Sequence, residues 1–170
     1  MVSEPDSVSP LEIEDALTTE FLGRSYHYYD EVESTNRVAK ELASDGAPEG
    51  TVVIAEAQVS GRGRLARGWY SPHGKGLWFS LVLRPKFPPI EAPKCTLMAA
   101  VALVKAFRAL GLTTAGIKWP NDIMVNGKKL VGILTEMNGS MEAISYIVMG
   151  IGINISSVQD ELPDEIKDIA

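Results

Sequence analysis

The chain has 170 residues, 45% of them hydrophobic, which is enough apolar material for the core of one domain. Its 16 basic and 22 acidic residues give a net charge of −6 at pH 7, which argues against a general nucleic-acid-binding protein. The single cysteine, Cys95, excludes an internal disulfide, and no apolar run approaches the roughly 20 residues of a membrane helix. We therefore expect a cytoplasmic protein with no DNA or membrane partner.

The first 24 residues are predicted to form an N-terminal tail and a short helix. Ser9 at the N-cap, Pro10 in the first turn and Glu12 have the pattern of a helix start. This helix should end near Gly23. One domain is then expected to occupy residues 25–170.

Helices and strands alternate through the predicted domain. One helix should begin at Ser34-Thr35-Asn36, and the longest should cover residues 94–110, with Leu97, Val101, Val104 and Leu110 on one apolar stripe. Strands are predicted at residues 26–29, 51–57, 77–83, 116–119, 123–125, 130–137 and 143–149. Asn-Gly pairs at 126–127 and 138–139 indicate hairpin turns. The predicted fold class is therefore α+β, with a mixed, largely antiparallel sheet flanked by helices.

A loop between two predicted strands is unusually rich in glycine and arginine. Residues 61–69 read Gly-Arg-Gly-Arg-Leu-Ala-Arg-Gly-Trp. Glycine lets the backbone approach a ligand closely, and guanidinium groups bind carboxylate or phosphate oxygens in pairs. The ring of Trp69 could stack on a base. A solvated basic loop is the plainer alternative, but the position between two apolar strands favours a site for a small anionic ligand.

Two further segments combine polar residues with glycine. Residues 118–122 read Lys-Trp-Pro-Asn-Asp and precede a predicted hairpin, so that Lys118 and Lys129 could converge on one pocket. On its own, this segment could equally be a turn with two solvated lysines. Residues 150–154, Gly-Ile-Gly-Ile-Asn, lack the full dinucleotide-binding fingerprint and could reflect close packing at a strand end.

Together these segments resemble the biotin protein ligase family over residues 26 to about 155. The resemblance rests on five blocks in order: Ser34-Thr35-Asn36, Gln58 with the loop at 61–69, residues 118–122, Lys-Lys-Leu-Val-Gly-Ile-Leu-Thr-Glu at 128–136, and residues 150–154. It implies a catalytic domain of the biotin and lipoate ligase type. Its fold would be similar to that of class II aminoacyl-tRNA synthetases.

The resemblance implies an ATP-dependent ligase that works in two steps. Biotin's carboxylate attacks the α-phosphate of ATP to give biotinyl-5′-AMP, and a lysine of a biotin carboxyl carrier domain then takes the biotin. Biotin, ATP and Mg²⁺ are the implied small ligands. The implied protein partner is the carrier domain of acetyl-CoA carboxylase or a related biotin enzyme, and a homodimer is left open.

The resemblance also implies roles for individual residues. The implied biotin ligands are Ser34, Thr35, Gln58, Gly61, Arg62, Arg64, Lys129, Gly132 and Gly150. The implied contacts to ATP or the adenylate are Arg64, Trp69, Asn121, Lys129 and Asn154. The implied catalytic set is Arg62, Arg64, Asp122 and Lys129, and Asp122 would also face a Mg²⁺ ion held through phosphate. Trp78, Trp119 and Cys95 are expected in the core.

Two features depart from the family pattern. Too little sequence precedes Tyr26 for a winged helix-turn-helix, so no repressor half is expected. The catalytic domain, expected at residues 25–170, should be truncated at its C-terminal end. A lipoate ligase-like acyl-adenylate enzyme and a non-catalytic biotin-binding fragment stay open as alternatives.

Overall fold

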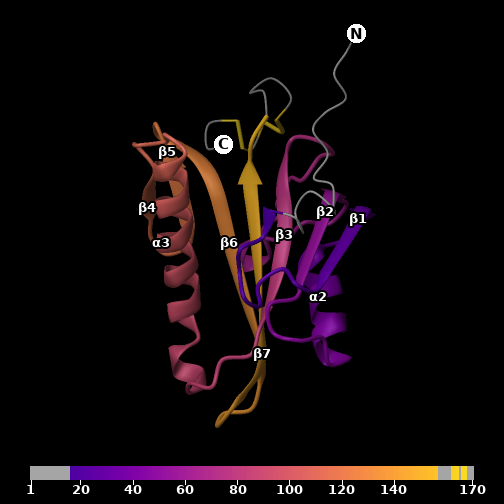
Figure 1. Cartoon of the computed structure of the whole chain (residues 1–170). Helices are drawn as coiled ribbons and strands as arrows, with labels where there is room; N and C mark the ends of the chain where they lie inside the picture. Colours follow the sequence, from indigo (N-terminus) through magenta and orange to yellow (C-terminus); the bar gives the residue numbers. More distant parts are fainter. Residues whose placement is uncertain (1–15, 157–161, 165, 168–170) are drawn as a thin grey trace.

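A computed structural model describes residues 16–156, 162–164 and 166–167 (Figure 1). Most of the helix predicted to begin at Ser9 lies outside the described residues. Within them, residues 17–19 are not helical and residues 20–25 form bends and turns, so the prediction of a helix reaching Gly23 is wrong. Regular structure begins at Tyr26. No helix of the described residues is long and apolar enough to cross a membrane.

Among the described residues, seven strands form one mixed sheet, in the order β1-β2-β3-β7-β6-β5-β4. They are β1 Tyr26–Val32, β2 Val52–Gln58, β3 Gly76–Leu83, β4 Gly116–Lys118, β5 Asp122–Val125, β6 Lys128–Gly139 and β7 Ile144–Asn154. Only β1 and β2 pair in parallel, and every other neighbouring pair is antiparallel. The α+β class with a largely antiparallel sheet is therefore confirmed.

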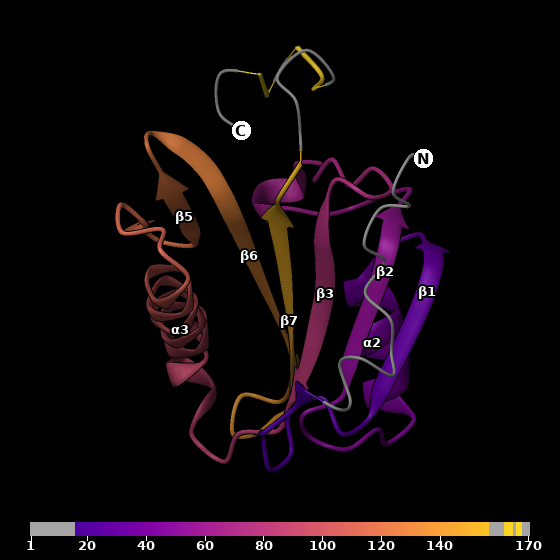
Figure 2. The same ribbon diagram turned by 45° about the horizontal axis from the view of Figure 1, so that its top comes forward.

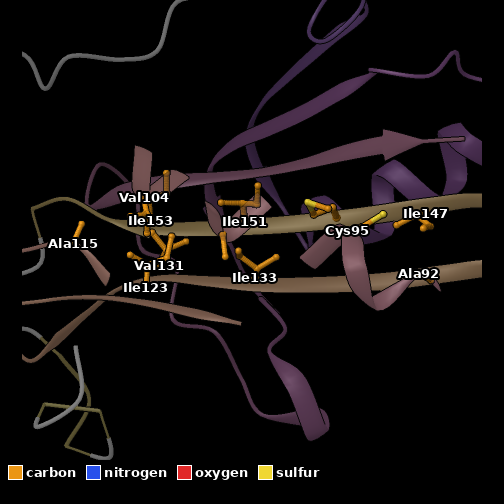
Figure 3. Close-up of a cluster of buried hydrophobic side chains, with 12 residues drawn as sticks. Ala92, Cys95, Val104, Ala115, Ile123, Val131, Ile133, Ile147, Ile151 and Ile153 are labelled. Carbon is orange, nitrogen blue, oxygen red and sulfur yellow. The ribbon is translucent and has the colours of Figure 1, made fainter. Parts of the chain in front are cut away.

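In the part of the chain that the structure describes, two α-helices pack on opposite faces of this sheet. Helix α2, Thr35–Ser44, lies against β2, β3 and β7, and α3, Pro93–Ala109, lies over β4, β5 and β6 (Figures 1 and 2). Side chains alternate along β7 because successive strand residues point to opposite faces. Val148 packs in the core under α2, whereas Ile147 and Ile151 pack in the larger core with Cys95 of α3 (Figure 3).

The buried face of α3 differs from the predicted stripe. Cys95, Ala100 and Val104 are buried, but Leu97 and Val101 are exposed, and Leu110 is 79% exposed beyond the end of the helix. The helix is apolar on nearly every side, and so its hydrophobic period could not show which face packs on the sheet. The contact face combines Cys95, Ala100 and Val104 with the partly buried Leu103 and Phe107.

Three predicted details of the strands and turns have different outcomes. Asn126 and Gly127 form the β5–β6 turn with φ of 51° and 80°, as expected for an Asn-Gly hairpin. The second predicted turn is wrong: Asn138 and Gly139 are the last residues of β6, and the backbone of Ser140 donates to Ala143 across the turn. Trp119 is also not in the core, because it lies at the β4–β5 turn and is 78% exposed.

Candidate functional site

A pocket of about 400 Å³ opens on the α2 face of the sheet. The start of α2, the glycine-arginine loop between β2 and β3, and the β4–β5 turn surround it, and β6 and β7 form its floor. Of the predicted site residues, it is lined by Ser34, Thr35, Gln58, Arg62, Arg64, Trp69, Asn121, Asp122, Lys129, Gly132, Gly150 and Asn154. Gly61 does not line it; it is buried at the base of the loop, where a Cβ would lie 2.3 Å from the carbonyl oxygen of Trp69.

The floor of the pocket is made of glycine. Gly132 of β6 pairs directly with Gly152 of β7, and the indole of Trp69 lies against both. A Cβ on Gly152 would be 2.3 Å from Trp69 Nε1, and a Cβ on Gly132 would be 2.6 Å from the same ring. The ring also meets Trp78 edge to face at 6.4 Å. Glycine at these positions therefore allows the Trp69 ring to lie directly on the sheet.

A lysine stands at one end of this floor. Lys129 Nζ is 2.8 Å from Asp122 Oδ1 and 5.1 Å from the centre of the Trp69 ring. Its strand is tied to β7, because Asn154 Nδ2 donates to the Lys129 carbonyl at 3.0 Å. Lys118 and Arg67 also line the pocket. This concentration of cations in a chain of net charge −6 suits an anionic ligand.

The glycine-arginine loop is linked to the opposite wall of the pocket. Arg64 Nη1 donates to Asn121 Oδ1 at 3.1 Å, while Asn121 Nδ2 donates to the carbonyl of Ile133 at 2.9 Å. Leu65 and Ala66, at the tip of the loop, have φ of 57° and 58°. These values cost energy for residues with a side chain, so the loop holds a strained conformation at the site.

Polar side chains at the other end of the pocket form a connected chain of hydrogen bonds. The backbone and hydroxyl of Thr35 both donate to Gln58 Oε1, at 2.9 and 3.2 Å, and Gln58 Nε2 donates to Ser71 Oγ at 2.8 Å. Ser80, fully buried in β3, lies 2.8 Å from Thr35 Oγ1 and 2.7 Å from Asn36 Oδ1. The start of α2 is thus held by side chains of β2 and β3.

A carboxylate lies beneath this polar end. Glu136 of β6 accepts a hydrogen bond from Asn36 Nδ2 at 2.7 Å and one from Lys40 Nζ. Burial raises the pKa of the Glu136 carboxyl, but the Lys40 and Asn36 hydrogen bonds outweigh burial and hold that pKa below its usual value. Glu136 is therefore ionised at neutral pH.

Three residues at or near the pocket were not assigned a role from the sequence. Asn36, Glu136 and Gly152 each lie within one of the five segments that resemble the family, and that position was the signal that could have identified them. Ser80 had no signal, because a serine in an apolar strand is unremarkable until its neighbours are known. Within the described residues, no group of three or more His, Cys, Asp or Glu side chains could hold a metal ion.

The family to which these segments belong is identified by comparison with known proteins. A model of the biotin/lipoate A/B protein ligase family matches residues 28–154. The chain belongs to this family. The resemblance based on the five sequence blocks is confirmed. The matched residues include the glycine floor and the glycine-arginine loop.

Two curated relatives are each about twice as long as the part that aligns with this chain. It is 47% identical over 170 residues to the bifunctional ligase/repressor BirA of Bacillus spizizenii, with 100% of this chain and 52% of that protein aligned. It is 39% identical over 133 residues to the biotin–[acetyl-CoA-carboxylase] ligase of Paracoccus denitrificans, with 75% of this chain and 53% of that protein covered. The chain therefore spans about half the length of these curated relatives.

A solved structure shows the same fold. The biotin protein ligase from Aquifex aeolicus in complex with biotin and ATP superimposes with a TM-score of 0.69 and 32% identity, covering 86% of this chain and 58% of that chain. The class of fold implied by the resemblance is thus confirmed. The roles of individual pocket residues stay predictions.

Proposed function

We propose that this chain is the catalytic domain of a biotin protein ligase. The observation that carries the proposal is the pocket itself: a glycine floor with Lys129 and Asp122 at one end and Thr35 and Gln58 at the other. Such a pocket suits a flat, elongated molecule with a carboxylate at one end and a polar ring at the other. The structure of the Aquifex relative in complex with biotin and ATP supports the same function.

The first step would join biotin to AMP. A carboxylate is already ionised at neutral pH, so the step needs no base. One carboxylate oxygen bonds to the α-phosphorus of ATP, and the bond from that phosphorus to pyrophosphate breaks. Lys129 and Arg64 would bring the two anionic reactants together and neutralise the charge of the transition state. The Asp122 contact holds the ammonium of Lys129 over the Trp69 ring, at the end of the pocket where the biotin carboxylate would lie.

The second step would transfer biotin to a lysine of a carrier domain. The neutral amine attacks the acyl carbon of the mixed anhydride, and AMP leaves with the acyl–oxygen electron pair. The attacking nitrogen must lose a proton, and Asp122 is the carboxylate at the pocket that could orient the amine or accept that proton. The name of the Paracoccus relative points to acetyl-CoA carboxylase as the source of the carrier domain.

Magnesium would be bound mainly by phosphate oxygens and water. Asp122 supplies one carboxylate to the pocket, which fits the preference of Mg²⁺ for one or two carboxylates beside substrate phosphates. When bound, Mg²⁺ would neutralise phosphate charge. Arg62, Arg64 and Lys129 would contribute the remaining positive charge from the chain itself.

Lipoate is the other ligand that the family name allows. The chain of hydrogen bonds from Thr35 through Gln58 to Ser71 favours biotin, because a ureido ring has both N–H donors and a carbonyl acceptor. The dithiolane ring of lipoate has neither. Paired polar groups of this kind discriminate strongly against a ligand that leaves them unsatisfied.

Calorimetry with biotin and then lipoate tests the proposal directly. We expect biotin to bind at one site per chain and lipoate to bind at least 100-fold more weakly. Biotin-dependent exchange of labelled pyrophosphate into ATP should then show the first chemical step. Absence of biotin binding, or tighter binding of lipoate, would contradict the proposal. Biotin binding without exchange would instead support the non-catalytic alternative.

A further inference from the structure

Glu136 is a half-buried charge that the two proposed steps do not use. Its carboxylate lies beneath the polar end of the pocket, with a side chain that is 28% exposed. Lys40, which lies one turn after Asn36 on α2, pairs with one oxygen, and Asn36 Nδ2 donates to the other at 2.7 Å. The carboxylate therefore contacts the first turns of the helix whose N-terminus lines the pocket.

This contact fixes which way the Asn36 amide points. Nδ2 is a donor and Oδ1 is an acceptor, so a reversed amide would place Oδ1 against the negative carboxylate of Glu136. With Nδ2 toward Glu136, Oδ1 points toward Ser80 Oγ at 2.7 Å and lies above Gly150. A Cβ at Gly150 would be 2.1 Å from that oxygen. Glycine in β7 thus makes room for the amide in this orientation.

Asn36 competes with Thr35 for the proton of Ser80. The Ser80 hydroxyl has one hydrogen and two acceptors in reach, Asn36 Oδ1 at 2.7 Å and Thr35 Oγ1 at 2.8 Å. When Ser80 donates its proton to Asn36, the Thr35 hydroxyl oxygen does not accept from Ser80, and its lone pairs are available to a ligand in the pocket. If the amide were reversed, Asn36 would donate to Ser80, and the Ser80 hydroxyl would be directed to Thr35.

The Thr35 hydroxyl is therefore prepared to accept rather than to donate. Its own proton is directed to Gln58 Oε1 at 3.2 Å, and Ser80 is drawn toward Asn36. An oxygen in this state matches a ligand N–H group. The polar end is separated from Lys129 along β7, because Asn36 meets Gly150 whereas the Lys129 carbonyl is bound by Asn154.

We propose that Glu136 is a positioning residue that acts through Asn36 and Ser80 to make Thr35 an acceptor for a ring N–H of the ligand. The inference rests on the proposed function and deepens it. It explains selectivity for a ligand with a cyclic urea by the carboxylate of Glu136, which lies outside the pocket wall. Glu136 does not touch the ligand. Its effect is on affinity for biotin and not on the chemistry at the carboxylate.

Exchanging the acid and the amide tests this role. Glu136→Gln removes the charge that holds Asn36, and Asn36→Asp places two carboxylates together, so each should weaken biotin binding about tenfold in calorimetry. In Asn36→Asp/Glu136→Gln, the new Gln amide can donate to one oxygen of the new Asp while the other still accepts from Ser80. We expect the double variant to bind biotin within about threefold of the parent chain.

The matched control is Glu41→Gln, which removes a carboxylate from the exposed side of the same helix, where it pairs with Arg37. It should leave biotin binding unchanged. The melting temperature of each variant separates a positioning role from a structural role. If Glu136 were only structural, affinity for biotin would fall in step with the melting temperature, and the double variant would bind biotin no more tightly than the single variants.

The outcomes distinguish this inference from the proposed function. If the parent chain does not bind biotin, both are overturned. If it binds biotin but the single variants bind equally well, or the double variant shows no recovery, the inference alone is overturned. Should Glu136→Gln fail to fold, comparison of Asn36→Asp with the double variant decides the same question by recovery or its absence.

Discussion

Two neighbouring lysines at the start of β6 have side chains in different surroundings. Lys129 points into the pocket, 2.8 Å from Asp122 Oδ1 and 5.1 Å from the Trp69 ring. Lys128 is exposed and donates to the carbonyl of Lys167 at 3.2 Å. Adjacent strand residues point to opposite faces, so these two lysines differ in position but not in chemistry. They are a matched pair for testing a charge at the pocket.

We expect Lys129→Ala to lower the rate of adenylate formation by roughly 100- to 1,000-fold, the range for loss of one preorganised charge contact in a transition state. Lys128→Ala should change it less than about twofold, because its ammonium is outside the pocket. Biotin-dependent pyrophosphate exchange measures both, and circular dichroism checks that both variants are folded. Equal losses at the two positions would refute the role given to Lys129.

At the residue scale, the sequence predicted which residues line the pocket better than it predicted why each residue type is needed there. Twelve residues named from the family blocks line the pocket, but nothing in the sequence showed that Gly150 makes room for the Asn36 amide. That close approach depends on β7 passing under α2, which are more than 100 positions apart. Contacts of this kind cannot be predicted from a local pattern.

Arg84 connects the C-terminal end of α2 to the sheet. Its guanidinium donates to the carbonyls of Ala43 and Ala47, at 2.7 and 2.8 Å from Nη2, and to the carbonyl of Ser145 at 3.1 Å from Nη1. It also lies 6.0 Å from the Tyr146 ring. The Ala43 carbonyl in the last turn of α2 also accepts from the Gly46 backbone at 3.3 Å, and Arg84 adds a charged donor to it and to the Ala47 carbonyl just beyond the helix.

Arg84→Ala should therefore destabilise the domain by about 2 kcal/mol, through loss of charged hydrogen bonds to half-buried carbonyls. For a chain of this size, that corresponds to a melting temperature lower by roughly 4–8 °C. Lys86→Ala, an exposed position two residues on, is the matched control and should leave the melting temperature unchanged. Similar melting temperatures for the two variants would show that Arg84 does not hold α2.

At the element scale, amphipathic patterns were predictive where the two faces differ in polarity. The helix expected from Ser34 is α2, and its apolar face is buried at Ala39 and Ala43. Helix α3 was predicted with nearly the right ends but the wrong face, since leucine and valine occur all round it. Residues of different size, from Ala100 to Phe107, pack on the sheet there, so hydrophobicity alone could not show which side of the helix is buried.

The pocket exists only when segments distant in sequence come together. The loop between β2 and β3 meets the β4–β5 turn through the hydrogen bond from Arg64 Nη1 to Asn121 Oδ1. This contact joins residues 57 positions apart and lies across the pocket opening. Asn121 is itself held by β6, because it donates to the Ile133 carbonyl at 2.9 Å. The glycine-arginine loop is thus attached to the β4–β5 turn and, through that turn, to β6.

Retention of the intermediate should depend on this attachment. Biotinyl-AMP is a reactive mixed anhydride, so a ligase must hold it until the correct lysine arrives. A charge-assisted hydrogen bond contributes roughly 1.5–3 kcal/mol, and each 1.4 kcal/mol is a factor of ten. Arg64→Gly should therefore speed release of the adenylate by roughly 10- to 100-fold and increase biotinylation of bystander proteins.

Ala66→Gly is the control that separates a lost contact from added flexibility. Ala66 lies in the same loop with φ of 58°, where glycine is accommodated without strain, and its substitution keeps the Arg64 guanidinium. Each variant is incubated with biotin, Mg-ATP and an unrelated lysine-rich protein, and the label on that protein is measured by blotting. Arg64→Gly should label it strongly, and Ala66→Gly should match the parent chain. If both variants label the lysine-rich protein equally, loop flexibility and not the Arg64–Asn121 contact controls release. If Arg64→Gly makes adenylate yet labels that protein no more than the parent chain does, Arg64 does not retain the intermediate.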